Sequence, residues 1–369
     1  MPLPLIIGAA AVAALGVGAK KAFDGYESHS QADEIVGKAR RRYDESKSAF
    51  DHQERKTQES LAGLGSLELN IGRDFDTFSA ISDKLLAQFN QGRQDKLSVN
   101  LPKHKLAQIE AYKFTALGVL GSVAGAGAAG AAVGFAVYGG VMTFAAASTG
   151  TAIASLSGVA ATNATLAAIG GGALSAGGLG MAGGMAILGA AVAAPVLAVA
   201  AWAYASHGED ALKNAHAASS EAAKAVEKLQ RATHSLRKTR EYVGKVHAAL
   251  HDIYIVFEGY LSKLREIDLF ITSARGVSQD ADVINRLLQS ISDDTMRYIN
   301  NGYMLAAILT DIITTPLFKL KYENGDIVKD ENGVPVMEKD SDGSMILNAE
   351  AINAAVDSGR EESSAVLPA

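Results

Sequence analysis

The chain contains one uncharged run that limits the folds open to it. From Phe114 to Ser206 there are 93 residues without Asp, Glu, Lys or Arg, and 19 of them are glycine. A helix on the surface of a water-soluble domain keeps a polar face toward solvent, so it rarely stays uncharged for this long. An apolar stretch of about 18 residues is already typical of a membrane span. The run therefore predicts a membrane-inserting protein in which it crosses the bilayer about two or about four times.

A second apolar stretch opens the chain, from Pro2 to Ala19, and is followed by Lys20 and Lys21. A cleavable signal peptide carries its positive charge before the apolar region, which favours an uncleaved anchor over 1–19. Val17-Gly18-Ala19 resembles a cleavage site, so cleavage stays open as the alternative. Positive flanking charges favour the cytoplasmic side of a membrane. These features predict a bacterial inner-membrane location with the charged parts of the chain in the cytoplasm.

The charged residues lie in two blocks and a tail. The first block (20–113) and the second block (207–315) each carry nearly equal numbers of acidic and basic residues, so the net charge of -6 comes from the acidic tail. Balanced blocks lack the basic excess of a nucleic-acid-binding protein, so we expect no nucleic-acid partner. The chain has no cysteine, which excludes disulfides, thiolate catalysis and cysteine-bound metals.

The second block carries an unbroken seven-residue repeat. A companion register starts three residues later at Ala232 and continues to Ala274. Two such registers form the apolar seam of a coiled coil. The predicted seam residues are Leu229, Leu236, Val243, Leu250, Phe257, Leu264 and Ile271.

The first block repeats less regularly, from Val36 to Leu85, and its glycines at 63, 65 and 72 predict a break or bend. A loop ending at Pro102 precedes a short helix predicted to begin at Lys103. The two blocks are expected to pack as one helical bundle, or each against another copy of the chain.

Beyond Pro316 the pattern changes to short runs separated by turn dipeptides such as Asn324-Gly325. We therefore expect a small β-meander over 316–348, then a short helix over Ala349–Val356 and a disordered tail within 349–369. The predicted fold class is an all-α membrane protein, in which long coiled-coil helices flank a glycine-rich transmembrane region (114–206) and precede this meander.

Small residues recur every four positions in the glycine-rich region, a pattern that lets membrane helices pack backbone to backbone. This packing is expected either within one helical hairpin or between protomers of an oligomeric pore. The predicted packing residues are Gly121, Gly125, Gly130, Gly134, Gly172, Gly180 and Gly184.

No motif in the chain predicts catalysis. Two G-x-G-x-x-G matches begin at Gly125 and Gly178, but no acidic residue occurs between Ala111 and Gly208 to bind a ribose. His247 and His251 lie one helical turn apart without the glutamate of a zinc-protease motif, so they are expected to be surface residues. We expect no enzyme activity, no cofactor and no metal.

The order of long helix, glycine-rich apolar region and long helix, over about 20–315, resembles the α-helical pore-forming toxins of the cytolysin A and haemolysin BL type. The run Ser148–Gly184 resembles glycine-rich membrane segments of uncharacterised bacterial proteins, and more loosely the small interferon-induced membrane proteins. These resemblances imply membrane insertion and a role in stress, death or defence.

Two functions follow from these patterns. In the first, a non-enzymatic effector oligomerises or opens through its glycine zipper and permeabilises a membrane. Its partners would be the lipid bilayer, further copies of the chain and an unknown protein regulator. In the second, a membrane-anchored coiled-coil scaffold or sensory protein gathers cytoplasmic partners.

Overall fold

The computed structural model describes residues 18–91, 93–122, 131–137, 209–277, 280–328, 335–341 and 343–366. The anchor predicted at 1–19 lies outside the described residues except for its last two positions. Of the predicted glycine-rich region, only 114–122 and 131–137 are described.

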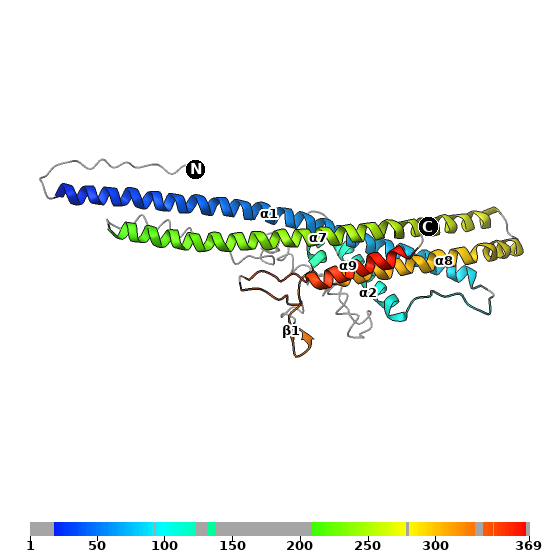
Figure 1. Ribbon diagram of the computed structural model, residues 1–369. Coiled ribbons are helices and arrows are strands. Elements are labelled where there is room, and N and C mark those ends of the chain that lie inside the picture. The colour runs from blue at the N-terminus through cyan, green and yellow to red at the C-terminus, as the bar shows by residue number, and fades with distance from the viewer. Residues whose placement is uncertain are drawn as a thin grey trace. The chain divides into compact units, whose positions relative to one another are not determined.

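The described chain is mostly helical (Figure 1). A short helix occupies 131–137. The other elements are α1 (Gly18–Phe89), α2 (Lys103–Ser122), α7 (Glu209–Val277), α8 (Ala281–Thr314), β1 (Tyr322–Glu323), β2 (Asp326–Ile327) and α9 (Ala349–Ser364).

The chain divides into two compact units. Unit 1 comprises Met1–His52 and Val192–Thr233, and unit 2 comprises Gln53–Ala191 and His234–Ala369. In unit 1, the first part of α1 packs against the first part of α7 through Ala32 and Ala215. Small side chains at this contact allow the two helix axes to lie close together.

In unit 2, neighbouring helices are tied by contacts that fix their directions. The hydroxyl of Thr57 donates to the carbonyl of Leu236 at 3.1 Å, and Lys84 pairs with Asp268 at 2.6 Å, so α1 and α7 run in the same direction. The Tyr112 hydroxyl donates to the backbone carbonyl of Glu68, so α2 doubles back along α1. Since α8 likewise returns along α7, the four helices alternate in direction as in an up-and-down bundle (Figure 1).

Aromatic side chains from all four helices meet in the core of unit 2. Phe75 of α1 makes edge contacts with Tyr112 of α2 and Phe257 of α7, with ring centroids 5.9 and 5.2 Å apart. Phe78 of α1 contacts Phe257 at 5.2 Å and Tyr303 of α8 at 5.1 Å. Edge and tilted geometries are the favoured arrangements for such rings. This cluster joins α1, α2, α7 and α8 into one core.

The seven-residue repeat of the second block corresponds to a buried stripe along α7. Each of its members, from Leu229 to Ile271, has at most 2% of its surface exposed. The pattern failed to predict the end of α7 at Val277 and the start of a separate α8. Asp280 caps α8 by accepting from the backbone amides of Asp282 and Val283, and an Asp in this position is a helix-start signal.

The glycines of the first block serve close packing. The predicted break is absent, because α1 is one continuous helix from Gly18 to Phe89. A Cβ atom on Gly72 would lie 2.3 Å from the Cβ of Ala116 on α2, so the missing side chain makes room for α2.

The described residues contain no helix that is both long enough and apolar enough to cross a bilayer. This finding overturns the predicted membrane fold class and the predicted inner-membrane location. The physical reason is visible in 114–122 and 131–137. Ala116, Val119, Phe135 and Val137 are buried, so their apolar surface contributes to packing inside the protein.

The C-terminal part differs in detail from the predicted meander and tail. It holds a two-stranded antiparallel sheet, β1–β2, and three isolated bridges. Asn324 and Gly325 both have positive φ, 54° and 91°, as a two-residue hairpin turn requires. The last helix, α9, continues to Ser364, eight residues beyond the predicted end at Val356, and in this added part Gly359 is buried close to Ile312 of α8.

Candidate functional site

A small cavity lies inside unit 2, beneath α9. Its volume of about 20 Å³ is room for about one water molecule. The walls come from several elements, and most of the side chains that line them are apolar, with Glu68 and Thr315 as the polar ones. They include Leu64 and Glu68 of α1, Val246 of α7, Ile312 of α8, and Ile352 and Val356 of α9.

Glu68 is the ionisable residue of this cavity. Only 3% of its surface is exposed, and its Oε2 atom has no hydrogen-bond partner among the described residues. Burial raises the pKa of the Glu68 carboxyl well above its usual value, because the charged form loses its hydration. An uncompensated buried charge is among the costliest features of a protein interior. Burial therefore favours the neutral form of the Glu68 carboxyl over the charged form while the cavity stays closed.

Helix geometry explains why an acid lies here. Glu68 follows Leu64 by four residues and precedes Ile71 by three, and both of these apolar residues are buried. Positions separated by three and four residues share one helix face, so Glu68 is carried into the core with them. Sequence reasoning missed Glu68 as a functional residue, although this spacing on the apolar face was the available signal.

A titratable side chain of another helix, Tyr112 of α2, contacts the backbone of Glu68. Its ring is fully buried, and its hydroxyl donates to the backbone carbonyl of Glu68 rather than to the carboxylate. Burial is the main cause that raises the pKa of the Tyr112 phenol well above its usual value, and a negative charge on Glu68, whenever the carboxyl ionises, raises it further. Tyr112 thus stays neutral and cannot balance a negative charge on Glu68.

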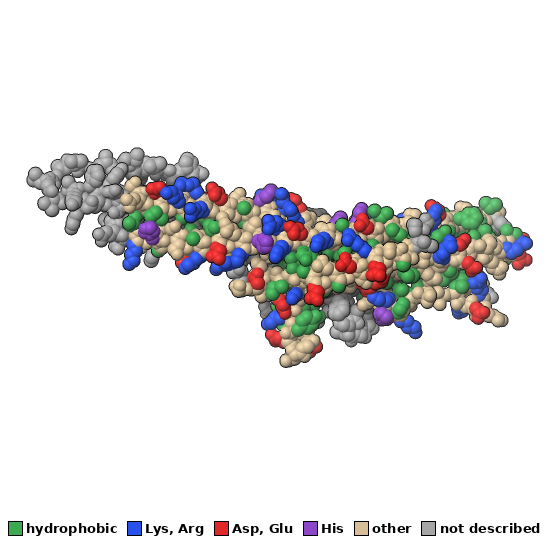
Figure 2. All heavy atoms as spheres, in the orientation of Figure 1, with side chains coloured by type: hydrophobic (Ala, Val, Ile, Leu, Met, Phe, Trp, Pro, Cys, Tyr) green, Lys and Arg blue, Asp and Glu red, His purple; other side chains and the backbone are tan. Residues whose placement is uncertain are grey.

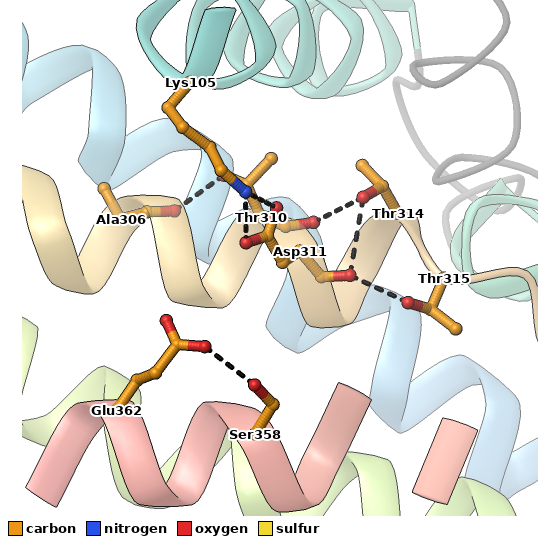
Figure 3. A network of polar contacts seen from close by, with 8 residues as sticks. All are labelled: Lys105, Ala306, Thr310, Asp311, Thr314, Thr315, Ser358 and Glu362. Carbon is orange, nitrogen blue, oxygen red and sulfur yellow. Dashed lines mark hydrogen bonds and ion pairs between the residues drawn. The ribbon is translucent and has the colours of Figure 1, made fainter. Parts of the chain in front are cut away.

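Helix α9 closes one wall of the cavity through a narrow apolar stripe. Ile352, Val356 and Gly359 are its buried residues. A Cβ atom on Gly359 would lie 2.6 Å from the Cδ1 atom of Ile312 and 3.3 Å from the Cγ2 atom of Ile308, so the glycine lets α9 lie close against α8. On the exposed side, Ser358 donates to Glu362 within α9 itself (Figure 3).

The neighbouring contact of α8 with α2 has a different character. Lys105 of α2 donates to both carboxylate oxygens of Asp311, at 2.6 and 2.5 Å (Figure 3). Nearby threonine hydroxyls of α8 and its C-cap donate to backbone carbonyls, as Thr314 does to Thr310 at 2.8 Å. The α2–α8 contact is thus held by a charged pair, whereas the buried residues by which α9 meets the bundle are apolar.

The predicted packing glycines are only partly described. Gly121 is exposed at the end of α2 with open space around it, and Gly134 is buried in the 131–137 helix. The remaining predicted members lie outside the described residues, namely Gly125, Gly130, Gly172, Gly180 and Gly184. The predicted packing of these glycines against one another therefore stays a prediction.

The paired histidines of α7 lie against each other on one helix. Their rings, at His247 and His251, lie 6.2 Å apart in a stacked arrangement. The described part of the chain holds no group of three or more His, Cys, Asp or Glu side chains placed to bind a metal ion.

Exposed apolar side chains gather at the end of the α7–α8 hairpin (Figure 2). Leu269 and Phe270 are 67% and 53% exposed, and Val277 and Val283 lie close by in the sequence on either side of the turn. Exposed apolar clusters often mark contact surfaces. No other part of the described chain covers this surface, so nothing in the structure indicates what would bind it.

Comparison with known proteins gives no family for the chain. No protein-family model, curated protein or solved structure matches it. The resemblance to pore-forming toxins therefore stays a prediction, as does the membrane-permeabilising role that was inferred from the glycine-rich region.

Proposed function

We propose that the chain is a non-enzymatic interaction protein of the scaffold or sensor type. In this proposal, the helical bundle of unit 2 holds α9 in a groove that the helix of a partner protein also fits. Release of α9 would expose the groove and allow the partner to bind.

The observation that supports this proposal is the narrow, apolar contact between α9 and the bundle. Burial of Ile352 and Val356 stabilises the docked helix by about 1.5–3 kcal/mol for each side chain. A helix of 16 residues is only marginally stable when isolated. The free energy of docking must therefore also offset the conformational entropy that the α9 segment loses when it becomes helical. A docking free energy this small would allow a competing helix to displace α9.

The groove defines the chemistry of the partner. It accepts two branched apolar side chains one turn apart, as at 352 and 356, and a small residue three positions later, where α9 has Gly359. An amphipathic helix with that spacing would occupy the groove in the same way, which is the helix-in-groove mode of recognition.

A peptide of residues 348–366 tests the proposal, because it carries the one sequence known to fit the groove. Fluorescence anisotropy of the labelled peptide would be followed with the full chain and with its Val356→Ser variant, whose own α9 is weakened. We expect the variant to bind the peptide at least about tenfold more tightly, since one lost apolar contact costs about 1.4 kcal/mol or more.

The matched control is Asn353→Ser, which changes an exposed residue of the same helix. This variant should bind the peptide no more tightly than the natural chain. Equal affinity for Val356→Ser and Asn353→Ser would show that the peptide does not compete with α9, and the proposal would fail.

A further inference from the structure

We propose that Glu68 binds the proton that keeps α9 docked, and that loss of this proton to solvent favours release of α9. This inference rests on the proposed function, because it assigns a regulator to the same groove.

The first step of the argument is the closed geometry around the carboxyl. Glu68 is buried, one of its oxygens lacks a hydrogen-bond partner among the described residues, and the adjoining cavity has room for about one water molecule. A single water cannot replace the hydration shell of a carboxylate, so the ionised form is unfavourable in the closed state.

The second step is the absence of charge in the surrounding walls. The cavity is lined by Val246 of α7, Ile312 of α8 and Ala136 of the 131–137 helix, and none of these side chains is titratable. Tyr112 of α2 is neutral and donates to the backbone of Glu68. On α8, the carboxylate of Asp311, which precedes Ile312 in the sequence, is paired with Lys105. No charge among these neighbours compensates an ionised Glu68.

The third step is the position of α9. Its residues Ile352, Ala355 and Val356 form one wall of the cavity, so undocking of α9 opens that wall to water. Hydration then lowers the cost of ionising Glu68 in the released state. Because the proton binds more tightly in the docked state, thermodynamic linkage requires that deprotonation favour release.

The direction of the pH effect follows from this linkage. The Glu68 pKa is raised in the docked state and lies nearer the usual value of 4.5 once the carboxyl is hydrated. Docking is therefore unaffected below the hydrated pKa and weakens as pH rises. The ratio of released to docked α9 increases by up to about tenfold for each pH unit, until the docked pKa is reached.

Spin labels measure the ratio of released to docked α9 directly in the full chain, which has no native cysteine. We would attach one label at Met304→Cys, an exposed position of α8, and the other at Asn353→Cys on the exposed side of α9. Electron–electron distance distributions would be recorded between about pH 5 and about pH 9. We expect a narrow distribution at the acidic end and a growing population of longer, broader distances as pH rises.

The same labels in a Glu68→Gln background provide the control, because glutamine is close in shape and does not titrate. In that background the distribution should stay narrow at every pH. Either a constant distribution in the chain that retains Glu68, or an equal change in the Glu68→Gln chain, would overturn the inference.

The two proposals fail in different ways. If the 348–366 peptide competes with α9 at one pH but the distances do not respond to pH, only the role of Glu68 is wrong. If the peptide does not compete with α9 at any pH, the proposal that the groove binds a partner helix fails.

Discussion

A Cβ atom placed on Gly65 of α1 would lie 1.8 Å from the carbonyl oxygen of Ala132, so the backbones of α1 and the 131–137 helix are in direct contact at this point. The atom that such a Cβ would meet belongs to the backbone of Ala132, which cannot move aside as the end of a flexible side chain can. This contact holds the 131–137 helix against the part of α1 that also carries Leu64 and Glu68.

Gly65→Ala is therefore expected to destabilise unit 2, by about 1–3 kcal/mol, because the added methyl group must push the 131–137 helix away. Gly63 is the matched control, since a Cβ atom there would meet nothing within 4 Å. Gly63→Ala should stabilise α1 by about 0.5–1 kcal/mol through its higher helix propensity. Urea unfolding measures both variants, and equal midpoints for the two would contradict the close contact.

Glu68→Gln is expected to change how stability depends on pH. The folded-state pKa of Glu68 lies above its unfolded value, so the natural chain loses stability as pH rises from the usual value of 4.5 toward the folded pKa. The loss is about 1.4 kcal/mol per pH unit at most, and release of α9 would limit it.

Below the usual pKa, the natural chain and the Glu68→Gln variant should unfold at similar urea concentrations, and the variant should become the more stable one as pH rises. Glu59→Gln serves as the control, since Glu59 is exposed on the same helix. Its effect should stay within about 0.5 kcal/mol. A Glu68→Gln variant that is less stable than the natural chain at neutral pH would show that the carboxyl has a stabilising partner.

The seven-residue repeat predicted the buried stripe of α7 because its signal is local. Spacing along one helix determines which side chains share a face, and an unbroken run from Leu229 to Ile271 leaves little ambiguity. Glu68 could be placed on the core side of α1 in the same way. That its Oε2 atom has no hydrogen-bond partner among the described residues could not be predicted, because this depends on which side chains of other helices lie against it.

The wrong predictions share a physical cause. Hydropathy measures how strongly a segment avoids water but not what covers it, so 114–122 and 131–137 were assigned to a membrane although their buried residues pack within the protein. Glycine is similarly ambiguous, because it suits both a bend and a close contact. At Gly65 and Gly72 only the neighbouring helices distinguish the two.

The pair Lys105–Asp311 is expected to contribute modestly to the contact of α2 with α8. The two side chains are 29% and 41% exposed, so solvent screens their attraction. A double-mutant cycle with Lys105→Ala and Asp311→Ala should give a coupling free energy below about 1 kcal/mol. The coupling should shrink further as salt is added. A larger coupling that salt does not change would mean that the pair behaves as a buried one.

The most direct test of an exchangeable α9 is a disulfide between α8 and α9, formed from Ile312→Cys and Gly359→Cys. The side chain of Ile312 is the closest to a Cβ atom on Gly359, and the chain offers no other cysteine to compete. Binding of the labelled 348–366 peptide would be measured on the same protein, oxidised and reduced. Our account predicts binding to the reduced protein and none to the oxidised protein. Equal binding in both states would contradict it.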